Sequence, residues 1–214
     1  MAKLPRRPDP LRLATLTPPV HTVPAGTLLW RVYFRGGPHP VDWSDFRQFG
    51  PLPQGRFDHH LPDDLDQPQL QSLGILYAAE NALTCFAEVF QQTRVIDRSY
   101  KHPWLVAWKT RAPIDLLDLT GGFPTQAGAS MALMTGPRSA ARTWARAFYS
   151  AYPALHGLYY PSSMYANRPT MAFNERAQAT GLLPARPSFH RALADETLLT
   201  VVRNAARELG YGLA

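Results

Sequence analysis

Short apolar stretches alternate with polar, turn-forming segments along the chain, and their lengths predict strands interspersed with a few helices. The third and fourth stretches are separated only by a turn around Ala112 and Pro113, and the last two by SMYANRP. We therefore expect each of these two couples to pair as neighbouring strands. The six stretches rich in β-branched and aromatic residues are 27–34, 74–79, 104–110, 114–119, 157–162 and 170–175.

Three segments instead repeat their apolar residues at helical spacing. Asn81 is a suitable N-cap for a helix over about residues 82–92. Pro137 suits the first turn of a second helix that continues to Tyr149, and a third follows the cap residue Asp195 and ends at Gly210. The apolar faces are Ala141, Trp144, Ala145 and Phe148 in the second helix, and Leu198, Leu199, Val202, Ala205, Ala206 and Leu209 in the third.

Two segments show neither the pattern of a strand nor the spacing of a helix. Residues 1–26 carry prolines at 5, 8, 10, 18, 19 and 24, a density that predicts an extended arm without helix. Residues 41–72 are rich in Gly, Pro and Asp, and we expect them to be mostly loop, including a solvated His59-His60 pair. The chain then divides into a proline-rich arm, 1–26, and a domain, 27–214. Because strands and helices do not alternate regularly, that domain is predicted to be α+β with a mixed or antiparallel β core and flanking helices.

Charge adds a preference for anionic partners. The 214 residues include 22 Lys and Arg against 16 Asp and Glu, which gives a net charge of +6. Arg138, Arg142 and Arg146 recur every four residues along the second helix, so a nucleic-acid-binding module without catalysis is one alternative. The sequence lacks a helix-turn-helix, zinc-finger or RNP motif for reading bases, so direct nucleic-acid binding is not our first expectation. A docking face for an acidic protein is another use of this stripe.

Cysteine content and hydropathy indicate the compartment. A single cysteine, Cys85, leaves no disulfide framework and no Cys-based metal cluster. No run of 18 apolar residues is present, and prolines interrupt the N-terminal segment where a secretion signal needs a continuous apolar stretch. We expect a cytoplasmic protein that does not enter a membrane.

One carboxylate stands out in the first predicted helix. The stretch ALTCFAEVF, residues 82–90, is apolar on almost every side, yet it contains Glu88. An unpaired buried carboxylate is costly, so Glu88 should meet a donor or a cation, or border a binding site. The alternative is a narrow solvated stripe formed by Glu88 with Gln91 and Gln92.

The segments around Glu88 resemble the RES domain family, which is named after an arginine, a glutamate and a serine. The matching segments are LLWRVY with Arg31, GRFDHH with Arg56, LYAAENALTCFAEVF with Tyr77 and Glu88, and GLYYPSS with Ser162. The resemblance covers about Thr27 to Arg176. Phe57-Asp58 depart from the pattern, because many members carry Trp-Asn there.

The resemblance implies an ADP-ribosyltransferase-like fold and an enzyme that cleaves the nicotinamide-ribose bond of NAD. The family includes toxins of bacterial toxin-antitoxin pairs, so a separate antitoxin protein that covers the site is the expected partner. NAD is then a substrate, and no cofactor is expected. The implied catalytic residues are Glu88, Arg31, Tyr77 and Ser162, and the implied NAD-binding residues are Arg31, Arg56, Tyr77 and Ser162.

Residue chemistry fits these roles. Glu88 would stabilise an oxocarbenium-like transition state, and arginine forks match the oxygens of a pyrophosphate. Tyr77 offers a flat face and a hydroxyl to the nicotinamide or ribose, and Ser162 a short hydrogen bond. Glycohydrolase, phosphorylase and protein ADP-ribosyltransferase activities all remain open. No metal is expected, because His59, His60 and the nearby aspartates lack a metal-ligand spacing. Gly121-Gly122 belong to neither a Rossmann fingerprint nor a P-loop, so no nucleotide-binding motif is predicted there.

Overall fold

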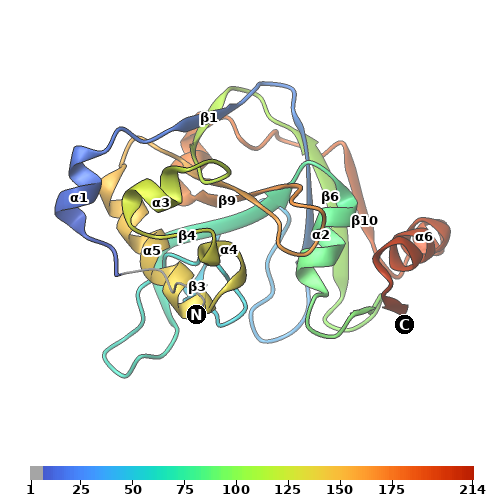
Figure 1. The fold of residues 1–214 in the computed structure, drawn as a ribbon. Helices are drawn as coiled ribbons and strands as arrows, with labels where there is room; N and C mark the ends of the chain where they lie inside the picture. The colour runs from blue at the N-terminus through green and yellow to red at the C-terminus, as the bar shows by residue number, and fades with distance from the viewer. Residues whose placement is uncertain (1–6) are drawn as a thin grey trace.

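A mixed β-sheet forms the centre of the computed structural model, which describes residues 7–214 (Figure 1). Its strands are β1 (Val20–Val23), β2 (Leu28–Phe34), β3 (Arg47–Gly50), β4 (Gln69–Ala79), β6 (Pro103–Lys109), β7 (Ile114–Asp118), β8 (Gly157–Pro161), β9 (Pro169–Asn174) and β10 (Phe189–Ala192). Their order is β1-β7-β8-β9-β4-β2-β6-β10, with β3 paired to β4 beside this path. Only β7 and β8 are parallel neighbours in this sheet. A separate parallel pair joins β5 (Val95–Ile96) to β11 (Gly212–Leu213).

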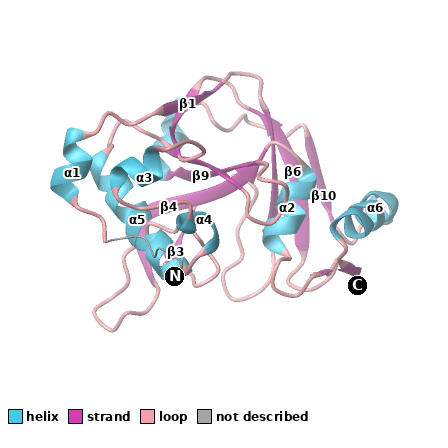
Figure 2. Cartoon of the chain, viewed as in Figure 1, coloured by secondary structure: helices cyan, strands magenta, loops and turns pink. Residues whose placement is uncertain are grey.

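The helices lie around this sheet (Figure 2). They are α1 (Pro10–Thr15), α2 (Ala82–Val89), α3 (Phe123–Ala127), α4 (Ala132–Thr135), α5 (Arg138–Ala151) and α6 (Leu199–Leu209), with 3-10 turns η1 (Glu175–Thr180) and η2 (Glu196–Leu198). None of the helices within residues 7–214 is long and apolar enough to cross a bilayer. The predicted α+β class, with a mixed sheet and flanking helices, is confirmed.

The two faces of the sheet are covered differently. On one face, α5 packs at one end together with α1, α3 and α4, and α2 and α6 pack at the other. On the opposite face, loop side chains such as Trp43, Phe46 and Leu182 cover Leu76 and Trp108. Because side chains alternate along a strand, each residue of β2 and β4 is assigned to one of these environments.

The sheet bends where its two halves join. β2 and β4 share one register pair, Trp30 with Ala79, whereas β2 and β6 pair along the whole of β2. In Figure 1, β4 accordingly runs at a steep angle to β6. We call this junction of β2 with β4 the fork. On one face of the sheet, Arg138 at the start of α5 contacts Gln91, which follows α2.

Several predicted elements are confirmed. The amide of Thr84 donates to Asn81 Oδ1 at 2.8 Å, so Asn81 is the N-cap of α2, which ends at Val89, earlier than predicted. Strands β8 and β9 pair antiparallel. The predicted apolar faces of α5 and α6 are largely buried, and Gly210 ends α6 in the left-handed conformation.

The prediction of a helix-free arm is wrong for its described part, and residues 1–6 lie outside the described residues. Asp9 Oδ1 accepts from the amide of Leu11 at 3.0 Å, and Pro10 occupies the first helical position, where its missing N–H costs nothing. Leu13 is fully buried against α5, and the hydroxyl of Tyr152 donates to its carbonyl at 3.0 Å. The arm also supplies strand β1.

The predicted pairing of 104–110 with 114–119 is wrong. β6 lies between β2 and β10, whereas β7 lies between β1 and β8. A short connection favours a hairpin only when no other edge competes, and here the arm strand β1 pairs with β7 through four residues. The loop predicted at 41–72 also contains β3 and the first residues of β4.

Candidate functional site

Helix α2 holds Glu88 at its last turn, beside the fork in the sheet. The Asn81 cap fixes the start of the helix, and Cys85 and Phe86 bury its apolar face against the sheet. The Cys85 thiol donates to the Trp30 carbonyl at 3.1 Å, which ties the helix to β2. Glu88 itself is only partly buried. The carboxylate therefore lies at the edge of the core, where a ligand can reach it.

Two side-chain donors hold the carboxylate of Glu88. The Ser162 hydroxyl donates to Oε1 at 2.5 Å, and Gln91 Nε2 donates to Oε2 at 3.2 Å. Ser162 Oγ also accepts from the amides of Met164 and Tyr165 at 3.1 Å each. Because these amides occupy the acceptor side of the hydroxyl, its proton is directed to Glu88. Sequence alone placed Ser162 and Glu88 in one site, and the structure brings them into direct contact.

Strand β8 delivers Ser162 immediately after its last residue. Ser162 is 1% exposed, and its amide donates to the Arg168 carbonyl at 2.8 Å, which closes the turn toward β9. Tyr160, two residues earlier on the same face, packs edge-on against Phe57 with ring centroids 4.6 Å apart. Burial raises the pKa of Tyr160 well above its usual value, so its hydroxyl stays neutral.

Tyr77 lies on the same face of the sheet, on β4. Its ring packs against the core formed by α5, and its hydroxyl is buried and donates to no acceptor among residues 7–214. Burial, reinforced by the negative charge of Asp58, raises the pKa of Tyr77, so the group is a neutral donor that lacks an acceptor. A β-carbon on Gly55 would come within 3.2 Å of this hydroxyl, which shows how closely the loop approaches it.

Arg56 reaches the same region from the loop before β4. Its Nη1 donates to the carbonyls of Leu133 at 3.1 Å and Gly136 at 2.9 Å. Burial lowers the pKa of Arg56, the nearby charge of Arg138 lowers it further, and Glu88 raises it. Arg56 is therefore an electrostatic neighbour of Glu88 although the two do not form an ion pair.

Arg31 is not brought into contact with this group. Strand alternation directs it to the opposite face, with Leu29 and Tyr33. Its Nη1 donates to the carbonyls of Trp43 at 2.7 Å and Asp45 at 3.0 Å, and burial lowers its pKa to about 10. In this structure Arg31 supports a loop, which departs from the predicted cluster with Glu88.

Sequence reasoning missed two members of the site. Gln91 was expected only in a solvated stripe, and Arg138 only in a basic stripe along α5. Arg138 Nη2 donates to Gln91 Oε1 at 2.6 Å, and Gln91 also donates to the backbone carbonyl of Glu88 at 2.6 Å. The spacing of Glu88 and Gln91, one helical turn apart, is the only sequence signal for this contact.

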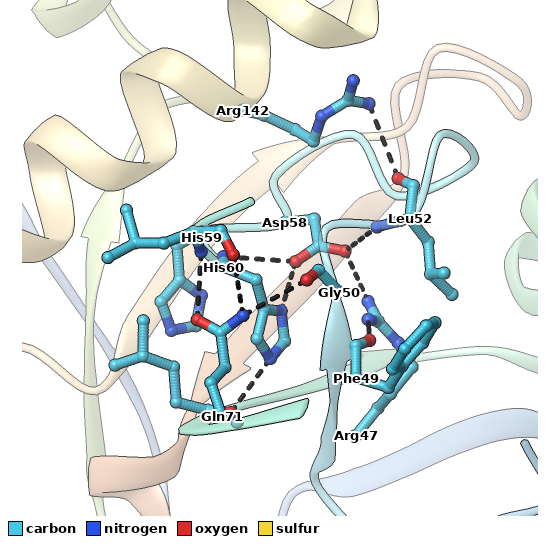
Figure 3. A network of polar contacts seen from close by, with 12 residues as sticks. Arg47, Phe49, Gly50, Leu52, Asp58, His59, His60, Gln71 and Arg142 are labelled. Carbon is cyan, nitrogen blue, oxygen red and sulfur yellow. Dashed lines mark hydrogen bonds and ion pairs between the residues drawn. The ribbon is translucent and has the colours of Figure 1, made fainter. Parts of the chain in front are cut away.

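The expectation of a solvated His59-His60 pair is wrong, because both side chains are buried (Figure 3). We call Arg47, Asp58 and His60 with their partners the Asp58 network. Asp58 Oδ1 pairs with His60 Nδ1, and its Oδ2 accepts from Arg47 Nη2 at 2.7 Å and from the Leu52 amide at 2.8 Å. His60 Nε2 contacts the Leu73 carbonyl at 2.9 Å. Although burial alone would raise the pKa of Asp58, His60 and Arg47 hold it far below its usual range.

His59 belongs to a neighbouring cluster. Its ring stacks on Tyr149 with centroids 4.6 Å apart, and its Nε2 lies 3.4 Å from Glu175 Oε2. Glu175 also accepts from the Tyr149 hydroxyl at 2.5 Å and from the Gly74 amide at 3.0 Å. Burial raises the pKa of Glu175, but the donors outweigh it and lower the pKa to about 2. The two histidines thus fasten the 57–73 loop to the domain.

The basic stripe on α5 is also used internally. Arg142 Nη1 lies 3.3 Å from the Pro53 carbonyl, and Arg146 Nη1 donates to the His60 carbonyl at 3.3 Å. Together with the contact of Arg138 to Gln91, each guanidinium of the stripe turns toward another part of the chain. The stripe therefore helps to hold the loop that carries Arg56.

Other sites receive no support from side-chain geometry within residues 7–214. No group of three or more His, Cys, Asp and Glu residues is arranged there to hold a metal ion. One hollow lies beneath His59 and Tyr149, and another lies between Pro18-Pro19 and Gly121-Gly122. Neither hollow is lined by Glu88, Arg138 or Ser162, so the arrangement of polar groups, rather than the size of a cavity, defines the candidate site.

Comparison with known proteins shows the family of the chain and a likeness in fold. A family model described as RES domain matches residues 28–195. Among solved structures, a chain from the crystal structure of the M. tuberculosis MbcT-MbcA toxin-antitoxin complex is similar to this one in fold. The TM-score is 0.53 at 17% identity, over 79% of this chain and 85% of that one. No curated protein matches in sequence.

Proposed function

The chain belongs to the RES domain family, and from that premise we propose that it consumes NAD by breaking the nicotinamide-ribose bond. The observation that carries the proposal is the Glu88 carboxylate held by Ser162 on one oxygen and Gln91 on the other. A carboxylate fixed in this way is preorganised to stabilise positive charge that develops on a sugar.

The reaction needs one carboxylate. When the bond from the nicotinamide nitrogen to ribose C1′ breaks, its electron pair stays on nitrogen and turns the pyridinium into neutral nicotinamide. The leaving group therefore requires no general acid, in contrast to ordinary glycosides, which need a second carboxyl group. Glu88 then faces the oxocarbenium-like ribose. When water attacks C1′, it releases one proton to the solvent as the new C–O bond forms, whereas a phosphate oxyanion attacks without losing a proton.

The surrounding residues supply binding. The hydroxyl of Tyr77, which donates to no acceptor in the described part of the chain, offers a donor to the substrate, while its ring provides an apolar wall. Arg56 adds positive charge for the pyrophosphate of NAD. Ser162 positions Glu88 and does not need to act as a nucleophile. We assign Arg31 to the support of the Trp43 loop behind the site.

We further propose that the protein is a cytoplasmic toxin that a separate antitoxin protein silences. The similarity in fold to a chain of a toxin-antitoxin complex supports this assignment. Transfer of ADP-ribose to a protein is the second candidate activity, because the same carboxylate would serve any oxygen or nitrogen acceptor.

The test measures nicotinamide release and NAD loss with purified protein, in buffers with and without phosphate, beside the Glu88→Gln variant. We expect release by the wild type and at least about a 100-fold slower release by the variant, since the variant loses the preorganised charge. A phosphate requirement would identify a phosphorylase. Absence of release in both buffers, and of labelled protein when a cell extract is added, would refute NAD consumption.

A further inference from the structure

Arg138 lies two hydrogen bonds away from the Glu88 carboxylate. Its Nη2 donates to Gln91 Oε1 at 2.6 Å, and Gln91 Nε2 donates to Glu88 Oε2 at 3.2 Å. Arg138 is the first residue of α5, so the core packing of a 14-residue helix fixes the origin of its side chain. The guanidinium is therefore placed beside the proposed reaction centre and is not a free surface arginine.

This guanidinium has an unused donor. The Nε atom of Arg138 is buried and has no hydrogen-bond partner in the described part of the chain. A buried donor without an acceptor destabilises the fold, so such groups are rare unless something else completes them. An oxygen of a bound ligand would restore the missing bond.

Two guanidinium charges gather here without an opposing ion pair. Arg56 lies close enough to Arg138 for the second charge to lower the pKa of the first. Arg56 contacts backbone carbonyls, and Arg138 contacts a neutral amide. By comparison, Arg47 pairs with Asp58, and Arg98 pairs with Glu196. Among the described residues, no carboxylate lies within 4.0 Å of a guanidinium nitrogen of Arg56 or Arg138.

We propose that Arg138, together with Arg56, binds the pyrophosphate of NAD in the role that sequence alone gave to Arg31. This assignment rests on the proposed NAD-cleaving function. A pyrophosphate carries two negative charges, which match two unpaired guanidiniums, and its oxygens accept from the planar donor fork of arginine. Arg138 then couples substrate binding to Gln91, and through Gln91 to the orientation of Glu88.

The first experiment measures binding of ADP-ribose by calorimetry, because this ligand keeps the pyrophosphate but lacks the scissile bond. We compare the wild type with Arg138→Gln, and with Arg203→Gln as a charge control on the exposed side of α6. We expect ADP-ribose to bind at least about tenfold more weakly to Arg138→Gln, since a charge-assisted bond is lost, and normally to Arg203→Gln. Equal affinity of Arg138→Gln and wild type, or no binding of ADP-ribose by wild type, would overturn the assignment.

The second experiment compares NAD with nicotinamide riboside, which has the same scissile bond and no phosphate. If Arg138 binds pyrophosphate, Arg138→Gln lowers kcat/KM for NAD at least about tenfold more than kcat/KM for nicotinamide riboside, because the second substrate loses only the support of Gln91. A role limited to holding Gln91 would instead lower kcat on both substrates equally, which would refute the proposal.

Two further variants keep the test decisive. Arg138→Lys retains the charge and protects the fold if Arg138→Gln is unstable, and it should weaken ADP-ribose binding because the fork is lost. Gln91→Ala should lower kcat while ADP-ribose affinity stays unchanged. If wild type binds ADP-ribose through Arg138 but releases no nicotinamide, the NAD-cleaving function fails while the pyrophosphate site stands.

Discussion

Two polar clusters lie within the same domain and differ in how completely their members are paired. In the Asp58 network, the carboxylate accepts from Arg47, His60 and the Leu52 amide, and both ring nitrogens of His60 have oxygen partners. Around Glu88, the Tyr77 hydroxyl and Arg138 Nε donate to no acceptor within residues 7–214. The first cluster is complete without a ligand, whereas the second is not.

The difference separates structural polar groups from functional ones. A buried charge that is fully paired fixes a loop and has no capacity left for a substrate. Unpaired donors next to a fixed carboxylate carry a cost that binding of an anion would relieve. The histidines, which look more like catalytic groups than glutamine does, therefore belong to the scaffold, while Gln91 belongs to the site.

The largest predicted effect comes from breaking the paired cluster. Asp58→Asn should lower the free energy of unfolding by about 3–5 kcal/mol, because Arg47 and His60 lose a buried charged partner. Urea denaturation at neutral pH measures the change. Asp64→Asn, an exposed change in the same loop, is the control and should stay within about 0.5 kcal/mol of the wild type. A similar small loss in Asp58→Asn would contradict a scaffold role.

Glu88→Gln should show the opposite profile. We expect turnover to fall by about 10²–10³-fold, while the free energy of unfolding changes by less than about 1 kcal/mol, because Glu88 is partly exposed and forms no ion pair within residues 7–214. Nicotinamide release and urea denaturation on the same preparation provide both numbers. Loss of stability on the scale of Asp58→Asn would place Glu88 in the scaffold instead.

Lowering the pH should destabilise the paired cluster of His59 and Glu175, which neighbours the Asp58 network. The pKa of Glu175 is lowered from 4.5 to about 2 in the folded protein, so its contribution is complete above about pH 4.5 and is lost as pH falls toward 2. The contribution is at most about 3 kcal/mol, and less because the side chain is partly exposed.

Denaturation curves of wild type and Glu175→Gln between pH 5 and pH 2 test this window. The variant should be less stable at neutral pH and should lose less stability on acidification. Glu196→Gln, which alters an exposed carboxylate, should keep the wild-type acid profile. Parallel pH dependences of wild type and Glu175→Gln would show that Glu175 is not the group responsible.

Arg31→Lys gives the smallest predicted effect and sharpens the division between the faces of the sheet. Sequence alone predicts weaker NAD binding for this variant. The contacts to Trp43 and Asp45 predict instead a stability loss of about 1–2 kcal/mol with little change in ADP-ribose affinity. Thermal denaturation and calorimetry on one sample decide between them, and an affinity loss without a stability loss would return Arg31 to the binding site.

The sequence by itself determined the local units of this protein. The Asn81 cap, the apolar turns of α2 and the β-rich stretches on either side define a strand, a turn and a helix, because caps and periodicity act within a few residues. The same local patterns carry the RES domain resemblance, so Glu88, Tyr77 and Ser162 could be named in advance. Contact between Ser162 and Glu88 followed once β8 and α2 met.

Only the tertiary structure decided which faces and edges meet. Pairing of β7 with β1 rather than β6, and burial of His59 and His60, depend on segments far apart in sequence. The packing of the sheet decides that the face of β2 with Arg31 lies under the Trp43 loop, whereas α5 brings Arg138 to Gln91 on the other face. No local pattern encodes these choices, because they arise from competition among all strands and helices for the same buried surface.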